Sequence, residues 1–455
     1  MYLPVESHLR ELDGKILLAA AAAERGRPAI LGFQSDLRGR MAGMPRGIYM
    51  AKSFGPPKPL ANFLRMFRDL GHAVVGWDEE GLVHAGQSVY AKRRASPRTL
   101  PTLSAIFSWG QDYTKLVTSL PYYHGTPLFE TGNPRIDLLH PRVRGYFDAE
   151  AAKLRAAYGG YILINSNFGR VNPLLGSAFV AAHDGSAATR RPQSAPPGEV
   201  WGNMVAHRFA LFEAFRNLLP VLAARFPGRQ IVLRPHPAER LDTWREVATG
   251  FSNVHIIREG AVAPWILGAE VMIHNGCTTA IESALLDRPA VAYQPLRSQQ
   301  NDWHLPNDVS HTAGSEDQLF QMLENHLEGS GRLTVTASQK ERLSHHVVLA
   351  DDTLAVDRIL DVIDRHEASW DREPPLLSRM ASGLLTRLRA AEAGITGVLI
   401  PRHMNSRVVQ DIHFPPLPES EMRQRLERFS KVTGRFSRVE VHAVTAKIFA
   451  FSAAA

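Results

Sequence analysis

Two short motifs carry side chains that could bind a phosphate. Arg234-Pro235-His236-Pro237 follows one apolar run, and Asn275-Gly276-Cys277-Thr278-Thr279 follows another. Proline has a fixed φ and no N–H, so the two prolines hold His236 in a stiff turn. Hydroxyls and free backbone N–H groups at the start of a helix form an anion site. Together the motifs predict a cradle for a phosphate or diphosphate.

The neighbouring residues predict the elements that would position these motifs. Residues 231–233 and 270–274 are apolar and indicate buried strands. Residues 280–286 indicate a helix that Thr278 or Thr279 would cap. Ligands of open α/β sheets bind at the carboxyl ends of strands, which is where both motifs stand.

The predicted binding residues of this region are Arg234, His236, Asn275, Gly276, Thr278, Thr279 and Glu282. A purely structural interpretation stays open for each motif. His236 could be a turn residue and Thr278 an ordinary helix cap. Glu282 follows Thr279 by three residues, as the acidic residue of a capping box does.

An acidic run, Asp78-Glu79-Glu80-Gly81, follows the predicted strand at residues 73–77. Three adjacent carboxylates repel one another, so one of them could have a raised pKa and act as a general base. We favour Glu79, which begins the acidic pair before the glycine and should point away from its two neighbours. The alternative is a solvated acidic turn.

Polar residues follow two further predicted strands. Asn165 and Asn167 come after residues 161–164, and Lys52 comes after residues 47–50. Asparagine tolerates the left-handed conformation, so turn chemistry is an alternative for the first pair. We predict that Asn165, Asn167, Lys52 and, nearer the N-terminus, Glu6 contribute to substrate binding.

Short strands alternate with helices along most of the chain, which predicts parallel sheets and an α/β fold. We expect a first Rossmann-like domain at 1–145, a second at 146–370, and a mainly helical extension at 371–455. A polar helix at 142–158 would connect the domains. Residues 180–200 are small, polar and proline-rich and indicate a loop.

The extension contains a basic amphipathic segment at residues 376–391. This helix could pack across the two domains, or it could dock on an anionic membrane that carries a lipid-linked acceptor. Residues 439–451 could form a strand pair or a helix, because periodicity does not distinguish the two.

Composition limits the function classes. The chain has 455 residues, 44% hydrophobic residues and a net charge of +7, which suits an anionic substrate or an anionic membrane surface. No arginine-rich arm, zinc-finger spacing or RNP-like strand indicates nucleic-acid binding. One cysteine excludes an intrachain disulfide, and no metal site or cofactor is expected. Neither a signal peptide nor a long apolar segment is evident, so we expect a cytoplasmic protein.

Two Rossmann-like halves with anion-binding turns in the second resemble the GT-B architecture of nucleotide-sugar glycosyltransferases. This resemblance implies two parallel sheets that face each other across a cleft. Several longer runs resemble the bacterial surface carbohydrate biosynthesis protein family over roughly residues 1–350. These runs are Leu3–Ser7 (which contains Glu6), Arg10–Asp13, Thr131–Leu139, Ile162–Phe168, Arg234–Pro237 and His274–Thr279.

A looser resemblance supplies a reaction. Bacterial sialyltransferases and Kdo transferases use CMP-activated keto sugar acids, and the sialyltransferases share an acidic pair before glycine, a His-Pro dipeptide and a paired Ser/Thr helix start. The corresponding residues here are Glu79-Glu80-Gly81, His236-Pro237 and Thr278-Thr279. The resemblance implies that Glu79, or its neighbours Asp78 and Glu80, deprotonates the acceptor. His236 would bind or protonate the leaving phosphate, and the threonines would hold the phosphate oxygens.

The sequence therefore predicts a metal-independent glycosyltransferase of surface polysaccharide biosynthesis. Its donor would be a nucleotide-activated sugar, with a CMP-linked keto sugar acid favoured, and its acceptor a glycan or a lipid-linked glycan. One alternative is a CDP-glycerol-type polyol phosphotransferase, in which His72, His84 or His124 would pair with His236. A UDP-sugar 2-epimerase-like enzyme and a non-catalytic scaffold are also compatible with these motifs.

Overall fold

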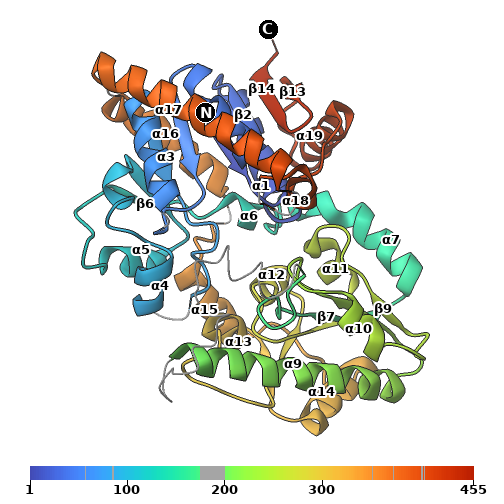
Figure 1. Cartoon of the computed structure of the whole chain (residues 1–455). Coiled ribbons are helices and arrows are strands. Elements are labelled where there is room, and N and C mark those ends of the chain that lie inside the picture. The colour runs from blue at the N-terminus through green and yellow to red at the C-terminus, as the bar shows by residue number, and fades with distance from the viewer. Residues whose placement is uncertain are drawn as a thin grey trace. The chain divides into compact units, whose positions relative to one another are not determined.

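The computed structural model shows two compact α/β units, and each is described by itself (Figure 1). The structure describes residues 1–56, 58–84, 87–174, 200–350, 352–371, 373–400, 403 and 405–454. Unit 1 comprises Met1–Tyr146 and Ser344–Ala455, and unit 2 comprises Phe147–Leu343. The predicted loop at residues 180–200 lies outside the described residues, except for Val200, where helix α9 begins.

Unit 1 is built on an eight-stranded sheet in the order β13-β14-β2-β1-β3-β4-β5-β6. Strands β1 to β6 are parallel, and β14 joins β2 in the antiparallel sense. The order 2-1-3-4-5-6 reverses between β1 and β3, and such a switch point is where open α/β sheets bind ligands. The strands are β1 (Tyr2–Val5), β2 (Ala29–Phe33), β3 (Ile48–Ala51), β4 (Ala73–Gly76), β5 (Ala105–Ser108), β6 (Leu128–Glu130), β13 (Val439–Thr445) and β14 (Ile448–Ala453).

Helix α1 (His8–Glu24) is the central helix of unit 1. Its alanine-rich second half is fully buried, since small residues allow close approach of α6, α16 and α19. It ends before Gly26, whose φ of 77° is the left-handed conformation expected after a helix. The other helices of unit 1 are α2 (Gln34–Arg40), η1 (Met41–Gly43), α3 (Lys58–Asp69), α4 (Gln87–Arg93), η2 (Leu100–Thr102), α5 (Gln111–Thr118), α6 (Pro134–Asp137), η3 (Arg144–Phe147), α16 (Ala355–Trp370), α17 (Leu376–Leu399), α18 (Arg407–His413) and α19 (Glu419–Thr433).

Unit 2 is built on a six-stranded parallel sheet in the order β12-β11-β10-β7-β8-β9. Numbered within the unit, this is the Rossmann order 3-2-1-4-5-6, with its switch point between β7 and β10. The strands are β7 (Tyr161–Asn165), β8 (Gln230–Arg234), β9 (Val254–Ile256), β10 (Val271–His274), β11 (Ala290–Tyr293) and β12 (His311–Ala313). The helices are α7 (Asp148–Tyr158), α9 (Val200–Arg225), α10 (Asp242–Val247), α11 (Val262–Gly268), α12 (Thr279–Leu285), α13 (His304–Asp308), α14 (Glu316–Glu328) and α15 (Ala337–His346).

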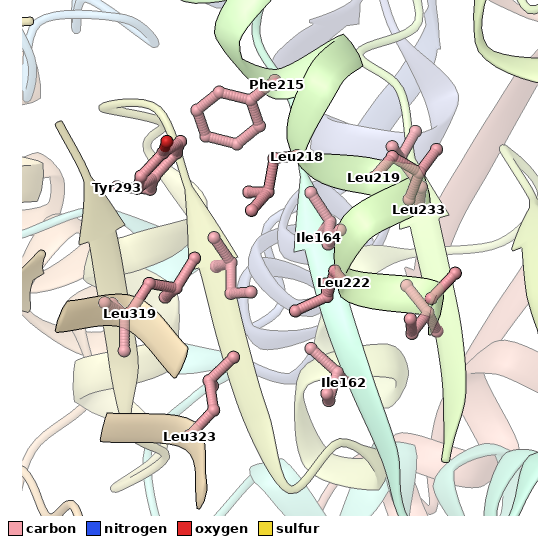
Figure 2. Close-up of a cluster of buried hydrophobic side chains, with 14 of the residues drawn as sticks. Ile162, Ile164, Phe215, Leu218, Leu219, Leu222, Leu233, Tyr293, Leu319 and Leu323 are labelled. Carbon is pink, nitrogen blue, oxygen red and sulfur yellow. The ribbon is translucent and has the colours of Figure 1, made fainter. Parts of the chain in front are cut away.

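The core of unit 2 lies between this sheet and helices α9 and α14 (Figure 2). Apolar side chains of α9 lie over β7 and β8, while those of α14 lie near Tyr293 of β11. The labelled members are Ile162, Ile164, Phe215, Leu218, Leu219, Leu222, Leu233, Tyr293, Leu319 and Leu323. Strands that are buried on both faces have continuous apolar sequences. This explains the apolar runs at residues 161–164 and 231–233, which form β7 and β8.

The two parallel sheets confirm the predicted fold class of two Rossmann-like α/β parts. The boundary between Tyr146 and Phe147 lies one residue from the predicted one, but unit 2 ends at Leu343 rather than at residue 370, because the chain then returns to unit 1. Helix α16 packs on α1 and α6, and the Asp137 carboxylate accepts hydrogen bonds from the N–H groups of Ala355 at 2.7 Å and Val356 at 2.9 Å. The extension also contributes β13 and β14 to the sheet.

The strand β14 explains the glycine in strand β2, Gly32. A Cβ at Gly32 would come within 2.8 Å of both the Ile448 side chain and the Lys447 carbonyl oxygen. Only glycine lets the last strand approach β2 this closely. Across the described part of the chain, no helix is long and apolar enough to cross a bilayer.

Candidate functional site

The switch point of unit 2 brings the two phosphate-binding motifs together with the Asn165 turn. Asn165 ends β7 and is paired with Arg234 at the end of β8 and with His274 at the end of β10. Strands β8 and β10 therefore flank β7 on either side. At about 4.8 Å per strand spacing, their ends lie roughly 10 Å apart, which is within the reach of one nucleotide phosphate group and its sugar.

Glu239 holds two of these turns together. Its fully buried carboxylate accepts hydrogen bonds from Ser166 Oγ at 2.8 Å, from the backbone N–H groups of Phe168 at 2.9 Å and His236 at 3.0 Å, and from Trp244 Nε1 at 2.9 Å. Burial raises the pKa of Glu239, although these four donors partly oppose the shift. No sequence pattern distinguished this glutamate, because it does not stand at a strand end.

The ring of His236 is oriented by its own turn. Nδ1 accepts a hydrogen bond from the backbone N–H of Ala238 at 3.2 Å. In the neutral imidazole the proton is therefore on Nε2, which can only act as a donor. The half-buried His236 side chain thus suits the predicted role beside a phosphate oxygen.

The turn after β10 is fixed by a chain of hydrogen bonds. His274 Nδ1 accepts from the N–H of Gly276 at 3.0 Å, His274 Nε2 lies 2.9 Å from Ser310 Oγ, and that hydroxyl donates to the Pro306 carbonyl at 2.8 Å. Burial lowers the pKa of His274 to about 3, so this ring stays neutral. Gly276 has φ of 80°, a conformation that favours glycine.

Three polar atoms at this switch point are buried and have no hydrogen-bond partner among the described residues. They are Asn165 Oδ1, Asn275 Oδ1 and Thr279 Oγ1. Asn165 is 3% exposed and Asn275 is 5% exposed. A buried polar atom without a partner costs about 1–3 kcal/mol. A ligand with hydroxyl or amino donors for the two amide oxygens would remove this cost.

The threonine pair stands where a helix start was predicted, but it does not cap the helix in the predicted way. Thr278 is at the N-cap position of α12, and its side chain makes no capping hydrogen bond. Glu282 lies in the first turn of the same helix. Asn167 contributes its backbone carbonyl, which accepts from Asn275 Nδ2 at 3.5 Å.

Arg208 of α9 belongs to the same region and was not predicted. It is 6% exposed, and it makes no hydrogen bond or ion pair with any residue that the structure describes, although its guanidinium lies 5.5 Å from the centre of the Trp303 ring. Burial lowers its pKa to about 10, Asp302 opposes this shift, and Arg170 and Cys277 are close enough to affect it. A desolvated guanidinium beside the Cys277–Thr278 turn is well suited to a phosphate.

Arg234, predicted to bind the ligand, has its guanidinium bound to a loop of unit 2. Its guanidinium donates to the backbone carbonyls of Glu259 at 2.6 Å, Gly260 at 2.8 Å and Arg258 at 3.3 Å, and it stacks on the Trp265 ring at 4.8 Å. These contacts engage three of the five N–H donors of the guanidinium, and Arg234 therefore fixes the 258–260 loop.

In unit 1 the three carboxylates of the acidic run lie in three different environments. Asp78 is fully buried and is held by Arg94 Nε at 3.1 Å and Tyr90 OH at 3.1 Å. Glu80 is half exposed and pairs with Arg10 and Arg94. Burial raises the pKa of Glu80, but the two arginines outweigh it and the net shift is downward. The run is therefore neither a solvated turn nor a group of mutually repelling acids.

Glu79 is 4% exposed and faces Lys15 of α1. Its Oε1 lies 3.0 Å from Lys15 Nζ, whereas its Oε2 has no hydrogen-bond partner among the described residues. A carboxylate with one oxygen ion-paired and the other free of donors remains able to accept a proton. Of the three acids, Glu79 has the geometry closest to that of a general base.

A buried charge network at the switch point of unit 1 includes the predicted residues Glu6 and Lys52. Lys52 Nζ pairs with Glu6 and with Glu11 Oε1 at 2.7 Å, and Lys15 Nζ pairs with Glu11 Oε2 at 2.9 Å. Burial lowers the pKa of Lys52, but Glu11 and Glu6 outweigh it and leave the pKa above its usual value. Burial raises the pKa of Glu11, whereas Lys15 and Lys52 hold it well below its usual range.

Glu11 and Lys15 were not predicted as site residues. They stand four apart on α1, the spacing that places two side chains on one helix face, so the sequence did contain a weak signal. Strands β1 and β3 end immediately before Glu6 and Lys52, and β4 ends one residue, Trp77, before the acidic run. Among the described residues, no cluster of three or more His, Cys, Asp or Glu side chains could hold a metal ion.

No protein-family model and no curated protein matches this chain. The solved structures that are similar to it over most of its length include the following three. A variant of the wall teichoic acid polymerase TagF soaked with CDPG has 11% identity and a TM-score of 0.37, and the match covers 79% of this chain and 97% of that one. The S. aureus MnaA–UDP co-structure has 11% identity and a TM-score of 0.46, with coverages of 82% and 98%. The Neisseria meningitidis UDP-GlcNAc 2-epimerase bound to UDP-GlcNAc has 12% identity and a TM-score of 0.46, with coverages of 80% and 99%.

Proposed function

We propose that this protein is a glycosyltransferase that binds a nucleotide-activated sugar at the switch point of unit 2. The observation that carries the proposal is the group of buried polar atoms on Asn165, Asn275 and Thr279 that have no hydrogen-bond partner among the described residues. The buried guanidinium of Arg208, which makes no hydrogen bond or ion pair with a described residue, lies close to Cys277. The amide oxygens would accept hydrogen bonds from ribose, sugar or base donors. Arg208 and the Thr279 hydroxyl would bind phosphate oxygens.

The favoured donor is a CMP-linked keto sugar acid, and the support for it is the motif order noted in the sequence. When the bond from the sugar carbon to the phosphate oxygen breaks, negative charge develops on the phosphate. His236 Nε2–H would donate to that oxygen, and Arg208 would neutralise the remaining charge. Protein groups can stabilise the leaving phosphate in this way, and we propose that the transfer is metal-independent.

We propose that Glu79 takes the proton from the acceptor hydroxyl. Lys15 Nζ pairs with Glu79 Oε1 at 3.0 Å, and Glu79 Oε2, which has no hydrogen-bond partner among the described residues, offers a lone pair for the proton. Asp78 is held by Arg94 and Tyr90, and Glu80 is held by two arginines. The acceptor would be a glycan or a lipid-linked glycan of a surface polysaccharide.

Nucleotide binding to the full chain tests the donor site. CMP, CDP, UDP and GDP would be compared by thermal shift, with Arg208→Gln as the site variant and Arg225→Gln as the control on the same helix. A nucleotide at about 100 times its dissociation constant stabilises the native state by roughly 2.7 kcal/mol. The proposal fails if no nucleotide stabilises the chain, or if Arg208→Gln and Arg225→Gln respond alike.

The same nucleotide panel distinguishes between possible donors. Preferential binding of CDP would favour a polyol phosphotransferase, and that of UDP would favour a 2-epimerase-like enzyme, with product analysis deciding between transfer and epimerisation. For the phosphotransferase, His72 is poorly placed as a second histidine. It precedes β4, at the end of the strand opposite to the acidic run, and its Nε2 lies 3.3 Å from the Met41 carbonyl oxygen.

A further inference from the structure

Helix α17 packs on unit 1 through its small and polar residues. Ser382 and Thr386 are buried, Ser382 Oγ donates to Asp69 Oδ2 at 3.1 Å, and Thr386 Oγ1 donates to the Ser382 carbonyl at 2.8 Å. A Cβ at Gly39 of α2 would lie 3.3 Å from the Ala390 side chain. The inner face of α17 therefore carries small and polar side chains. An ordinary surface helix instead turns its apolar side chains toward the core.

The outer face of α17 is apolar along its whole length. Leu377 is 81% exposed and Val398 is 82% exposed. The exposed members of this face are Leu376, Leu377, Met380, Leu384, Leu385, Leu388, Ile395, Val398 and Leu399. Figure 1 shows α17 as a long orange helix, and it packs on α2 and α3 of unit 1. Contiguous exposed apolar surface of this extent marks an interaction site.

The apolar stripe of α17 is straight and long enough to lie on a flat surface. Leu377 and Ile395 are separated by 18 residues, or five turns at 3.6 residues per turn, so the stripe runs straight for about 27 Å. The residues Leu377, Ala381, Leu384, Leu388, Ala391, Ile395 and Val398 also alternate spacings of four and three, as a coiled-coil seam does. Charge rather than periodicity therefore distinguishes a second copy of this chain from another partner.

The charge of α17 and its neighbours favours an anionic partner. Arg379 and Arg387 are exposed, with Arg387 at the rim of the stripe, and Glu392 is the one acidic residue of the helix. Exposed Arg40 of α2 and Arg65 of α3 add positive charge on the two helices that pack against it. The whole chain has a net charge of +7. Apolar residues combined with arginines at the rim are typical of a helix that lies in the plane of a membrane interface.

We propose that the exposed face of α17 docks unit 1 on an anionic lipid bilayer, with the helix parallel to the membrane plane. The leucines would enter the boundary between headgroups and acyl chains, and the arginines would contact lipid phosphates. The docking surface belongs to unit 1, whereas the residues of the proposed nucleotide site belong to unit 2. The docking proposal therefore does not depend on the identity of the donor.

Flotation of the full chain with vesicles tests this surface. Vesicles of phosphatidylglycerol and phosphatidylcholine would be compared with phosphatidylcholine alone, at about 0.1 M and 0.5 M salt, since salt screens the charge contribution. The site variant is Leu384→Gln/Leu388→Gln. The control is Leu349→Gln/Val444→Gln, which removes two exposed apolar side chains elsewhere in unit 1. We expect the wild type and the control to float with the anionic vesicles, and the site variant to lose at least tenfold in the bound fraction.

Circular dichroism and thermal unfolding would verify that both variants keep the fold, as expected for exposed positions. Absence of wild-type flotation, or equal flotation of the site variant, overturns the proposal. Equal flotation on phosphatidylcholine alone overturns the assignment to an anionic surface. A concentration-dependent dimer that Leu384→Gln/Leu388→Gln abolishes, without flotation, would instead identify a second copy of the chain as the partner.

Discussion

The Glu239 carboxylate accepts a hydrogen bond from the backbone N–H of His236 at 3.0 Å and so links the His-Pro turn to the Asn165 turn. We predict that Glu239→Gln disorders both turns, because an amide would direct N–H donors at groups that are themselves donors. Nucleotide affinity should fall at least tenfold, and unfolding in urea should show a loss of about 2–4 kcal/mol.

Glu246→Gln, at an exposed glutamate on the following helix, is the matched control and should leave both quantities unchanged. Normal nucleotide affinity in Glu239→Gln would show that the carboxylate does not position the site.

Arg208→Gln should weaken nucleotide binding without lowering the stability of the fold. The guanidinium is buried without an ion pair among the described residues, so its removal should leave the free energy of unfolding unchanged or raise it by about 1 kcal/mol. Nucleotide affinity, measured by calorimetry, should fall by at least tenfold because the phosphate loses its cation. A clear loss of stability together with unchanged affinity would identify Arg208 as a structural residue.

Glu79→Gln should abolish transfer while retaining donor binding. The substitution removes the proton acceptor in unit 1 and leaves the residues of the donor site in unit 2 unchanged. Lys15 keeps its contact with Glu11 at 2.9 Å, so the fold of unit 1 should persist. Rates would be compared with Glu80→Gln, which should remain active, and with Asp78→Asn, which should unfold more easily because Arg94 loses a buried partner. Near-normal turnover in Glu79→Gln would exclude Glu79 as the base.

Asp137 should give unit 1 a pH-dependent stability. Burial raises the pKa of this carboxyl to about 7 from 3.8, and the N–H groups of Ala355 and Val356 only partly oppose the shift. The native state therefore binds the proton more tightly than the unfolded chain, and the contribution of Asp137 falls as the pH rises from about 4 to about 7. The total change is at most about 4 kcal/mol.

Urea midpoints at pH 5 and pH 8 would measure this effect. Asp137→Asn should reduce the difference between the two pH values, whereas Asp371→Asn, at an exposed carboxylate of the same unit, should preserve it. An unchanged difference in Asp137→Asn would assign the pH dependence to other groups.

Local sequence signals predicted the strands and the two turns of the proposed site well, since they depend on apolar runs and on proline and glycine. Strand β8 covers the predicted 231–233, β10 covers most of 270–274, and α12 begins at the predicted threonine pair. Residues whose roles come from distant contacts were missed. Arg208 lies in the middle of a long helix, and Glu239 matters only because four donors from separate segments converge on it.

Long-range packing also explains where the sequence-based interpretation of Arg234 and of the domain boundary departed from the structure. Arg234 stands at a strand end, but three backbone carbonyls of the 258–260 loop occupy its donors. The return of the chain to unit 1 depends on the fit of α16 against α1 and α6, which no local pattern encodes.

The pairing of β14 with β2 has a consequence for the order of folding during synthesis. Unit 2 is one continuous segment, whereas the sheet of unit 1 is completed only when residues 448–453 have left the ribosome. Until then, the edge of β2 exposes unpaired backbone groups beside Gly32, and such an edge is prone to pairing with other chains. Unit 2 can therefore fold first, and the newly made N-terminal segment has to remain unaggregated while some three hundred residues are added.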